Sequence, residues 1–149
     1  MKILLVSDTH SNNEAVDLLQ KTYPNMDIYL HLGDSETDEY HMGNFRTVRG
    51  NMDYYGNFPD YLLIPTPFGN MYATHKPIMN DKLFKQQDVR IFVHGHTHIR
   101  KFIYENGLIV VNPGAVSFPR DKYDGSFAIM EITPEKVDVT FHTLEEIIS

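Results

Sequence analysis

The chain of 149 residues has 20 acidic and 13 basic side chains, and its formal net charge is -7. This acidic balance argues against general nucleic-acid binding, although a small phosphoester could bind where metal cations reverse the local field. Cysteine is absent, which excludes disulfide bonds, thiolate metal sites and a cysteine nucleophile.

The first third of the chain predicts a β-α-β arrangement. Apolar runs predict buried strands over residues 2–7 and 27–32, and a third strand is expected over residues 45–49. Residues 11–14 (Ser-Asn-Asn-Glu) fit a capping box for a helix that ends near Pro24, with an apolar face of Ala15, Leu18 and Leu19. A weaker helix is expected over residues 36–41. Strands connected in this way are parallel, with right-handed crossovers.

The rest of the chain predicts hairpins. A turn at 67–70, an Asn-Gly turn at 106–107 and a turn at 133–136 each separate two predicted strands. These strands cover residues 61–65, 70–75, 100–104, 108–112, 126–132 and 136–142. A short helix over 79–87 leads into a further strand over 89–94. Seven or more strands with few helices predict an α/β fold of two packed sheets with helices outside, in one domain over residues 1–149.

The N-terminus does not resemble an export signal. Its apolar run, residues 3–6, is short and is followed almost at once by Asp8. No stretch of the sequence approaches the length of a membrane span. We therefore expect a cytoplasmic protein that does not bind membranes.

Seven side chains that can bind metal ions follow the predicted strands in five short motifs. They are Asp8 and His10 (SDTH), Asp34 (LGD), Asn51 (RGN), His75 (ATH), and His96 and His98 (HGHTH). Each motif alone is compatible with an ordinary turn or a hydrogen-bonded histidine. The ends of neighbouring strands can, however, deliver side chains to one shared rim, and alternation would place the two donors of a motif on the same side. Together the motifs predict one two-metal site with nitrogen and oxygen ligands.

Glycine adjoins three of these donors, at positions 33, 50 and 95, where a residue without Cβ allows close approach. The remaining histidines are interpreted differently. His31 is expected to be a core or hydrogen-bonded residue, and His94 a core residue or a support for the ligands. His41 and His142 are expected to face solvent.

Several residues near the motifs allow two interpretations. Arg49 and Lys76 are the nearest cations and could contact phosphate or be surface charges. Asp53 could hydrogen-bond a ligand imidazole or be a turn residue. A cluster of aromatic residues could form a partner or subunit surface, or pack on its own domain: Tyr54, Tyr55, Phe58 and Tyr61.

With these motifs in this order, the chain resembles the calcineurin-like metallophosphoesterase superfamily, especially its small bacterial and archaeal phosphodiesterases. The resemblance runs from Met1 to about Ala115 and includes Asn112-Pro113-Gly114. It implies a four-layer α/β/β/α fold in which two mixed sheets form a sandwich flanked by helices. It also implies that Asp8, His10 and His98 hold one metal, that Asn51, His75 and His96 hold a second, and that Asp34 bridges both.

The predicted reaction is hydrolysis of a phosphoester, most simply a phosphodiester, by in-line attack of a hydroxide that bridges two divalent metals. Asp34, Asn51 and His75 are the expected catalytic group. Manganese is the expected metal, and Ni, Zn, Fe, Mg and Co are compatible with the same donors. The expected partner is a small phosphoester substrate, and a homo-oligomer is compatible with the sequence.

The sequence departs from the family pattern in three places. Met52 replaces a histidine that is thought to protonate the leaving group in larger members, Lys76 replaces a common glycine, and Ala115 replaces a serine. Leaving groups of high pKa should therefore be harder to expel. Two alternatives stay open: a phosphomonoesterase with the same site, and a non-catalytic protein-binding scaffold, as in the retromer subunit of this fold.

Overall fold

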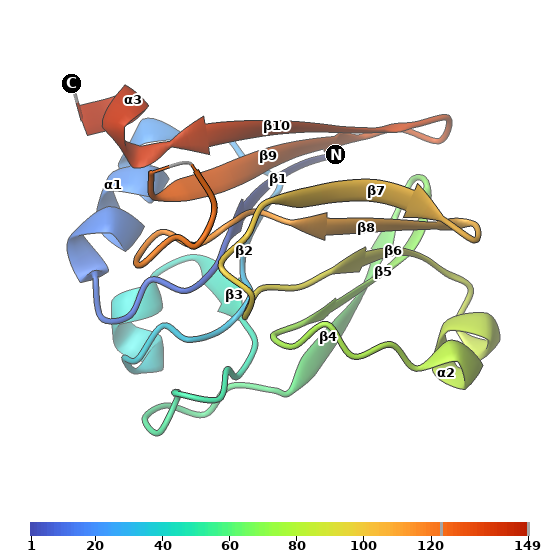
Figure 1. Cartoon of the computed structure of the whole chain (residues 1–149), viewed down its shortest axis with the longest axis horizontal. Coiled ribbons are helices and arrows are strands. Elements are labelled where there is room, and N and C mark those ends of the chain that lie inside the picture. The colour runs from blue at the N-terminus through green and yellow to red at the C-terminus, as the bar shows by residue number, and fades with distance from the viewer. Residues whose placement is uncertain (123, 149) are drawn as a thin grey trace.

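Two five-stranded sheets form the centre of the computed structural model, which describes residues 1–122 and 124–148. The first sheet has the order β10-β9-β1-β2-β3 (Figure 1). β1 pairs in parallel with β2 and antiparallel with β9, so the sheet is mixed, and the predicted parallel start of the chain is confirmed. Its strands are β1 (Lys2–Val6), β2 (Ile28–His31), β3 (Phe45–Thr47), β9 (Ser126–Ile132) and β10 (Val137–Thr143).

The second sheet has the order β4-β5-β6-β8-β7 and is also mixed. Two hairpins, β4–β5 and β7–β8, pair antiparallel, whereas β6 pairs in parallel with both β5 and β8. Both hairpins occur where the turn residues predict them. The strands are β4 (Tyr61–Thr66), β5 (Gly69–Thr74), β6 (Val89–Val93), β7 (Lys101–Glu105) and β8 (Leu108–Asn112).

Three apolar clusters hold the layers together. In β1, alternate side chains face different layers. Ile3 and Leu5 point into the core between the sheets, whereas Leu4 and Val6 contact the helical layer. That layer contains α1 (Asn13–Thr22) and α3 (Leu144–Ile148), which lie near each other in Figure 1. On the outer face of the second sheet, α2 (Asp81–Gln86) buries Phe84. The predicted sandwich of two mixed sheets flanked by helices is confirmed.

The helix boundaries differ in detail from the prediction. Asn12, not Ser11, caps α1 and accepts a hydrogen bond from the backbone N–H of Ala15. Ser11 cannot act as the cap, because its backbone has a φ of 67° and its hydroxyl donates to the carbonyl of Glu36. The buried face of α1 includes Val16, whereas Leu18 is only half-buried.

Two shorter elements also differ from the sequence-based prediction. The weak helix expected over 36–41 is a 3-10 turn, η1 (Glu39–Met42), whose Met42 is buried. The C-terminal helix α3 was not predicted. Across the residues that the structure describes, no helix is both long and apolar enough to cross a membrane.

Candidate metal centre

The carboxyl ends of strands from both sheets meet at one edge of the sandwich. β1 leads to Asp8 and His10, β2 to Asp34, β5 to His75, and β6 to His96 and His98. Donor atoms of Asp8, His10 and His98 lie within 4.8 Å of one another, and so do those of Asp8, Asp34 and His75. Asp8 belongs to both groups, so the two clusters form one continuous centre.

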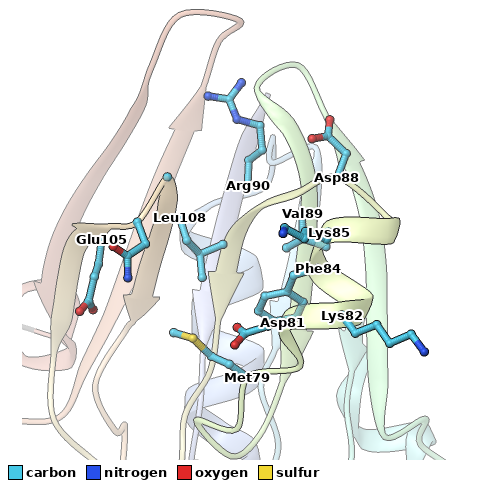
Figure 2. Close-up of a pocket in the computed structure, with 12 residues that line it drawn as sticks. Met79, Asp81, Lys82, Phe84, Lys85, Asp88, Val89, Arg90, Glu105 and Leu108 are labelled. Atoms are coloured by element: carbon cyan, nitrogen blue, oxygen red, sulfur yellow. The ribbon is translucent and has the colours of Figure 1, made fainter.

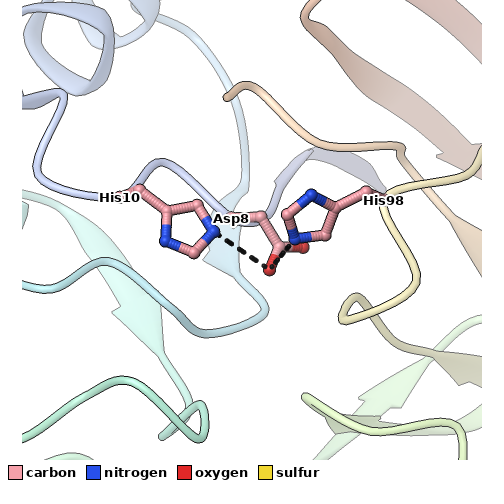
Figure 3. A group of neighbouring side chains, drawn as sticks. All are labelled: Asp8, His10 and His98. Carbon is pink, nitrogen blue, oxygen red and sulfur yellow. Dashed lines mark ion pairs between the residues drawn. The ribbon is translucent and has the colours of Figure 1, made fainter. Parts of the chain in front are cut away.

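The first cluster surrounds one oxygen of Asp8 (Figure 3). Asp8 Oδ1 lies 3.3 Å from His98 Nε2 and 3.9 Å from His10 Nε2. Asp8 and His98 are buried, and His10 is half-buried. Both histidines direct Nε2 towards the carboxylate, as ligands of a common ion would.

The second cluster surrounds His75. His75 Nε2 lies 3.3 Å from Asp34 Oδ2 and 3.3 Å from His96 Nδ1, and His96 Nδ1 lies 3.1 Å from Asn51 Oδ1. The structure thus brings together all seven side chains that the sequence singled out. They provide only nitrogen and oxygen donors, which suit first-row divalent metals.

Two buried atoms in the centre show that its donors fit a cation. Asp8 Oδ1 and His10 Nε2 are buried and have no hydrogen-bond partner among the described residues. A buried polar atom without a partner costs about 1–3 kcal/mol, so native proteins rarely leave one. A metal ion that these two atoms share would satisfy both at once.

The opposite nitrogen of three of the histidines is already held. His10 Nδ1 lies 2.6 Å from Glu36 Oε1, His75 Nδ1 lies 2.8 Å from the carbonyl of Leu32, and His98 Nδ1 lies 2.8 Å from the carbonyl of Phe118. Each acceptor requires a proton on Nδ1, which leaves the Nε2 lone pair directed into the centre. Contacts of this kind fix the tautomer and orientation of metal-binding histidines.

Backbone geometry positions the donors. Five of them have left-handed backbone, with φ between 46° and 72°, a conformation that is uncommon outside glycine and is concentrated at functional sites: Asp8, His10, Asp34, His96 and His98. Strand alternation is therefore the wrong reason for the pairing of Asp8 with His10, because both lie beyond the end of β1 at Val6. The donors converge through left-handed turns.

The glycine prediction is supported at Gly50 and Gly95. A Cβ on Gly50 would lie 2.1 Å from Asp34 Oδ1, and one on Gly95 would lie 1.9 Å from the hydroxyl oxygen of Ser7. That hydroxyl donates to Asp8 Oδ2 at 2.7 Å. Only glycine leaves room for the two carboxylates at these positions.

The carboxylates and imidazoles of the centre shift the pKa values of one another. Burial acts to lower the pKa of His75, but the carboxylate of Asp34, 3.3 Å from its Nε2, and the charge of Asp8 raise that pKa overall. The Asp8 carboxylate, 3.3 Å from Nε2 of His98, likewise raises the pKa of His98. Burial acts to raise the pKa of Asp8, yet His98, His75 and Ser7 together lower it. The acidic groups thus stay ionised and attract positive charge, which protons or metal ions can supply.

Asp53 fits the second of its two interpretations, a turn residue beside Asn51, because its N–H donates to the carbonyl of Gly50 at 3.2 Å. Its buried carboxylate accepts hydrogen bonds from the backbone N–H groups of Asp34 (2.9 Å), Gly50 (2.7 Å) and Glu36 (2.8 Å), and from the Ser35 hydroxyl (3.2 Å). It therefore ties the turn that carries Asp34 to the turn that carries Asn51.

Sequence reasoning missed the residues that orient the histidines. Glu36 follows Asp34 by two positions and holds His10, and its own φ of 53° continues the left-handed geometry. A carboxylate so near a metal motif was the available sequence signal. Leu32 and Phe118 act through backbone carbonyls, which no side-chain pattern reveals.

The two cations near the motifs are both exposed. The Arg49 side chain donates from Nε to the carbonyl of Phe58, which anchors it to the following loop. The positive charge of Lys76 contributes to lowering the pKa of His96, after burial and His75, so Lys76 lies close to the centre.

The other histidines mostly match expectation. His31 is buried, with Nε2 3.0 Å from the Thr9 hydroxyl and Nδ1 accepting from the N–H of Gly33 at 3.0 Å. His94 is buried, with Nδ1 3.0 Å from the carbonyl of Gly95, and His41 is exposed. The prediction for His142 is wrong, because its ring is half-buried and stacks on Phe127 at 5.5 Å.

The aromatic cluster after Asn51 is only partly exposed. Tyr54 and Tyr55 are 77% and 68% exposed, and Tyr61 is 49% exposed and stacks on Tyr72. Phe58 is buried in the cluster beside α1, so this residue packs on its own domain, the second of the two interpretations.

A groove of about 990 Å³ lies away from the centre, between α2 and the β7–β8 turn (Figure 2). Phe84, Val89 and Leu108 contribute apolar side chains to its lining, and the other lining residues include charges of both signs, such as Asp81, Lys82 and Arg90. None of the seven predicted donors lines this groove. It is a separate feature from the candidate metal centre.

A sequence model of one protein family, the calcineurin-like phosphoesterase superfamily domain, matches residues 1–135, so the chain belongs to this superfamily. A probable metallophosphoesterase of Bacillus subtilis, YsnB, is 27% identical over 95% of this chain and 90% of its own length. The crystal structure of a predicted phosphoesterase from Streptococcus pneumoniae is also 27% identical, with a TM-score of 0.85 over 95% of this chain and 88% of that one. A single mutant of Vps29 from Entamoeba histolytica shares the fold at 21% identity and a TM-score of 0.75, over 97% and 93% of the two chains.

Proposed function

We propose that the chain is a dinuclear metal-dependent phosphoesterase that acts on phosphodiesters. The observation that carries this proposal is the convergence of seven nitrogen and oxygen donors on one centre, with two buried donor atoms lacking any protein partner among the described residues. Membership of a phosphoesterase superfamily supplies the reaction class. A cytoplasmic location agrees with the cysteine-free, acidic composition.

In this proposal Asp8, His10 and His98 hold one ion, Asn51, His75 and His96 hold the other, and Asp34 contributes to both. Two bound divalent cations would supply a nucleophilic water of low pKa and positive charge for the phosphate oxygens. Of the seven proposed ligands, only Asp8 and Asp34 carry negative charge, so two divalent cations together with these ligands are net positive; the carboxylates of Glu36 and Asp53 lie outside the ligand set. Manganese is the metal we propose.

The residues of the chain also shape substrate choice. Asn51 is exposed and Met52 is 39% exposed, so a phosphate carrying groups on two sides can approach. Met52 cannot donate a proton, which favours leaving groups of low pKa. The alternative of a scaffold without catalysis fits less well, because no donor position of the family pattern is replaced here.

Chelator-stripped protein should be assayed with bis(p-nitrophenyl) phosphate and with p-nitrophenyl phosphate after addition of Mn, Ni, Zn, Fe, Mg or Co. The diester should be hydrolysed only after metal addition, and His96→Ala and Asp34→Asn should abolish the activity. His41→Ala and Asp38→Asn make the same changes at an exposed pair outside the centre and should keep it. Full activity of thoroughly stripped protein would refute the proposal, and a preference for the monoester would replace the diesterase by a phosphomonoesterase.

A further inference from the structure

The strand β7 forms an exposed edge of the second sheet. It pairs on one side with β8, and no other described strand lies on its other side (Figure 1). All five of its residues are exposed, including Phe102 (44%), Ile103 (39%) and Tyr104 (68%). An apolar edge of this kind presents unpaired backbone N–H and C=O groups to any strand that can join it.

The other three sheet edges carry features that discourage such pairing. β3 has only three residues, with Arg46 exposed at its centre. β4 contains Pro65, which has no N–H to donate. β10 exposes Asp138, which pairs with Lys136. By contrast, β7 (Lys-Phe-Ile-Tyr-Glu) has neither proline nor net charge.

The sequence of β7 is complementary to itself in one antiparallel register. If two copies cross at Ile103, Lys101 of each lies opposite Glu105 of the other, and Phe102 lies opposite Tyr104. Neither Lys101 nor Glu105 forms an ion pair within the described part of one chain, so both charges are available. Opposite charges and aromatic residues placed directly across a strand pair both stabilise it.

In this register, side chains of the same kind would also lie on the same face of the joined sheet. Phe102 and Tyr104 pair with Val111 and Ile109, which belong to the core between the sheets. Side chains alternate, so Lys101, Ile103 and Glu105 lie on the opposite face. The aromatic pairs would therefore extend the core, while the charged pairs would lie on the outer face.

We propose that β7 pairs antiparallel with β7 of a second copy of this chain, about a two-fold axis at Ile103, and joins two five-stranded sheets into one. The expected product is a symmetric homodimer, in which each half uses the same surface. This interface does not depend on the metal centre or on the proposed activity.

Sedimentation equilibrium of the full chain over a range of concentrations tests the interface. The wild-type chain should reach the mass of a dimer, and Ile103→Lys, which places two like charges face to face, should leave a monomer. Ile148→Lys is the matched control, because Ile148 is 69% exposed in α3, away from β7, and this variant should dimerise normally. Circular dichroism verifies that each variant is folded.

Charge reversal tests the register. In K101E or E105K alone, both charged pairs of the dimer become repulsive, so the dissociation constant should rise roughly tenfold. An equimolar mixture of K101E with E105K should associate at least as tightly as the wild-type chain, because every pair is then opposite in charge. A monomeric wild-type chain, a dimer that I103K leaves intact, or a mixture that fails to associate would each overturn the proposal. Binding of β7 to a strand of a different protein, with no self-association, would overturn it as well.

Discussion

The carboxylate of Asp53 should be essential for holding the two halves of the metal centre together. It accepts four hydrogen bonds, from the backbone N–H groups of Asp34, Gly50 and Glu36 and from the Ser35 hydroxyl. Asp53→Asn replaces one oxygen by an NH2 group, which cannot accept, so one pair of these donors loses its acceptor. Hydrogen bonds to a charged group contribute about 1.5–3 kcal/mol each, so two of them are worth roughly 3–6 kcal/mol. The neutral amide avoids the cost of burying a charge, which offsets part of this loss. We therefore expect the free energy of unfolding to fall by about 3 kcal/mol.

Urea denaturation of the metal-free protein measures this loss, and calorimetric titration with Mn²⁺ measures the consequence for binding. Displacement of the Asp34 turn from the Asn51 turn should weaken metal binding by about 10- to 100-fold, the range seen when residues that orient ligands are changed. Asp38→Asn is the control, because Asp38 is half-exposed and bonds only within its own turn. If D53N lost less than about 1 kcal/mol and bound metal as tightly as the wild type, the anchoring role assigned from these contacts would be wrong.

Three further substitutions address other links between the centre and the fold. Burial lowers the pKa of His31 to about 4, against 6.5 for a free imidazole, so the unfolded chain takes up a proton between these values while the folded chain does not. Stability should fall by about 3 kcal/mol as the pH drops from 6.5 to 4, and pH-dependent unfolding of His31→Asn should lack this component. Gly50→Ala places a Cβ 2.1 Å from Asp34 Oδ1 and should abolish metal binding in the same titration, whereas Gly107→Ala, which meets nothing within 4 Å, should not. Met52→His adds a proton donor beside Asn51. It should speed hydrolysis of esters with alkyl leaving groups by up to about 100-fold, with little change for p-nitrophenyl esters. Equal acceleration of both kinds of ester would exclude a proton-donating role for the new side chain.

Local patterns in the sequence were sufficient to predict most of the fold. Alternation and turn residues located the hairpins at 67–70 and 106–107, because glycine and asparagine there accommodate turns that other residues resist. The helix α3 was missed because five residues carry too little periodicity, and its Leu144 and Ile147 are ordered by packing against the cluster beside α1. Long-range packing explains the error at His142, whose half-buried ring stacks on Phe127. It also decides between the two interpretations of Phe58, which is buried beside α1.

The composition of the centre was predictable, but its geometry was not. Asp8, Asp34 and His98 could be chosen because acidic and imidazole groups followed strands. Their precise convergence depends on left-handed turns and on backbone carbonyls at Leu32 and Phe118, which have no side-chain signature. Asp53 illustrates the limit, because the sequence allowed either an imidazole partner or a turn residue and gave no sign that its carboxylate would accept from three backbone N–H groups.

The strained backbone and the partnerless polar atoms of the centre both lower the stability of the metal-free fold. Left-handed backbone at non-glycine residues costs about 1–3 kcal/mol each, and the partnerless atoms of Asp8 and His10 add a similar amount. Such a centre persists because the surrounding structure holds it, through Asp53 on one side and through the close packing that Gly50 and Gly95 permit on the other. Since a bound cation favours only the folded arrangement, its binding free energy adds to folding stability. The arrangement that is unfavourable for the chain alone is therefore the one that prepares it to bind metal.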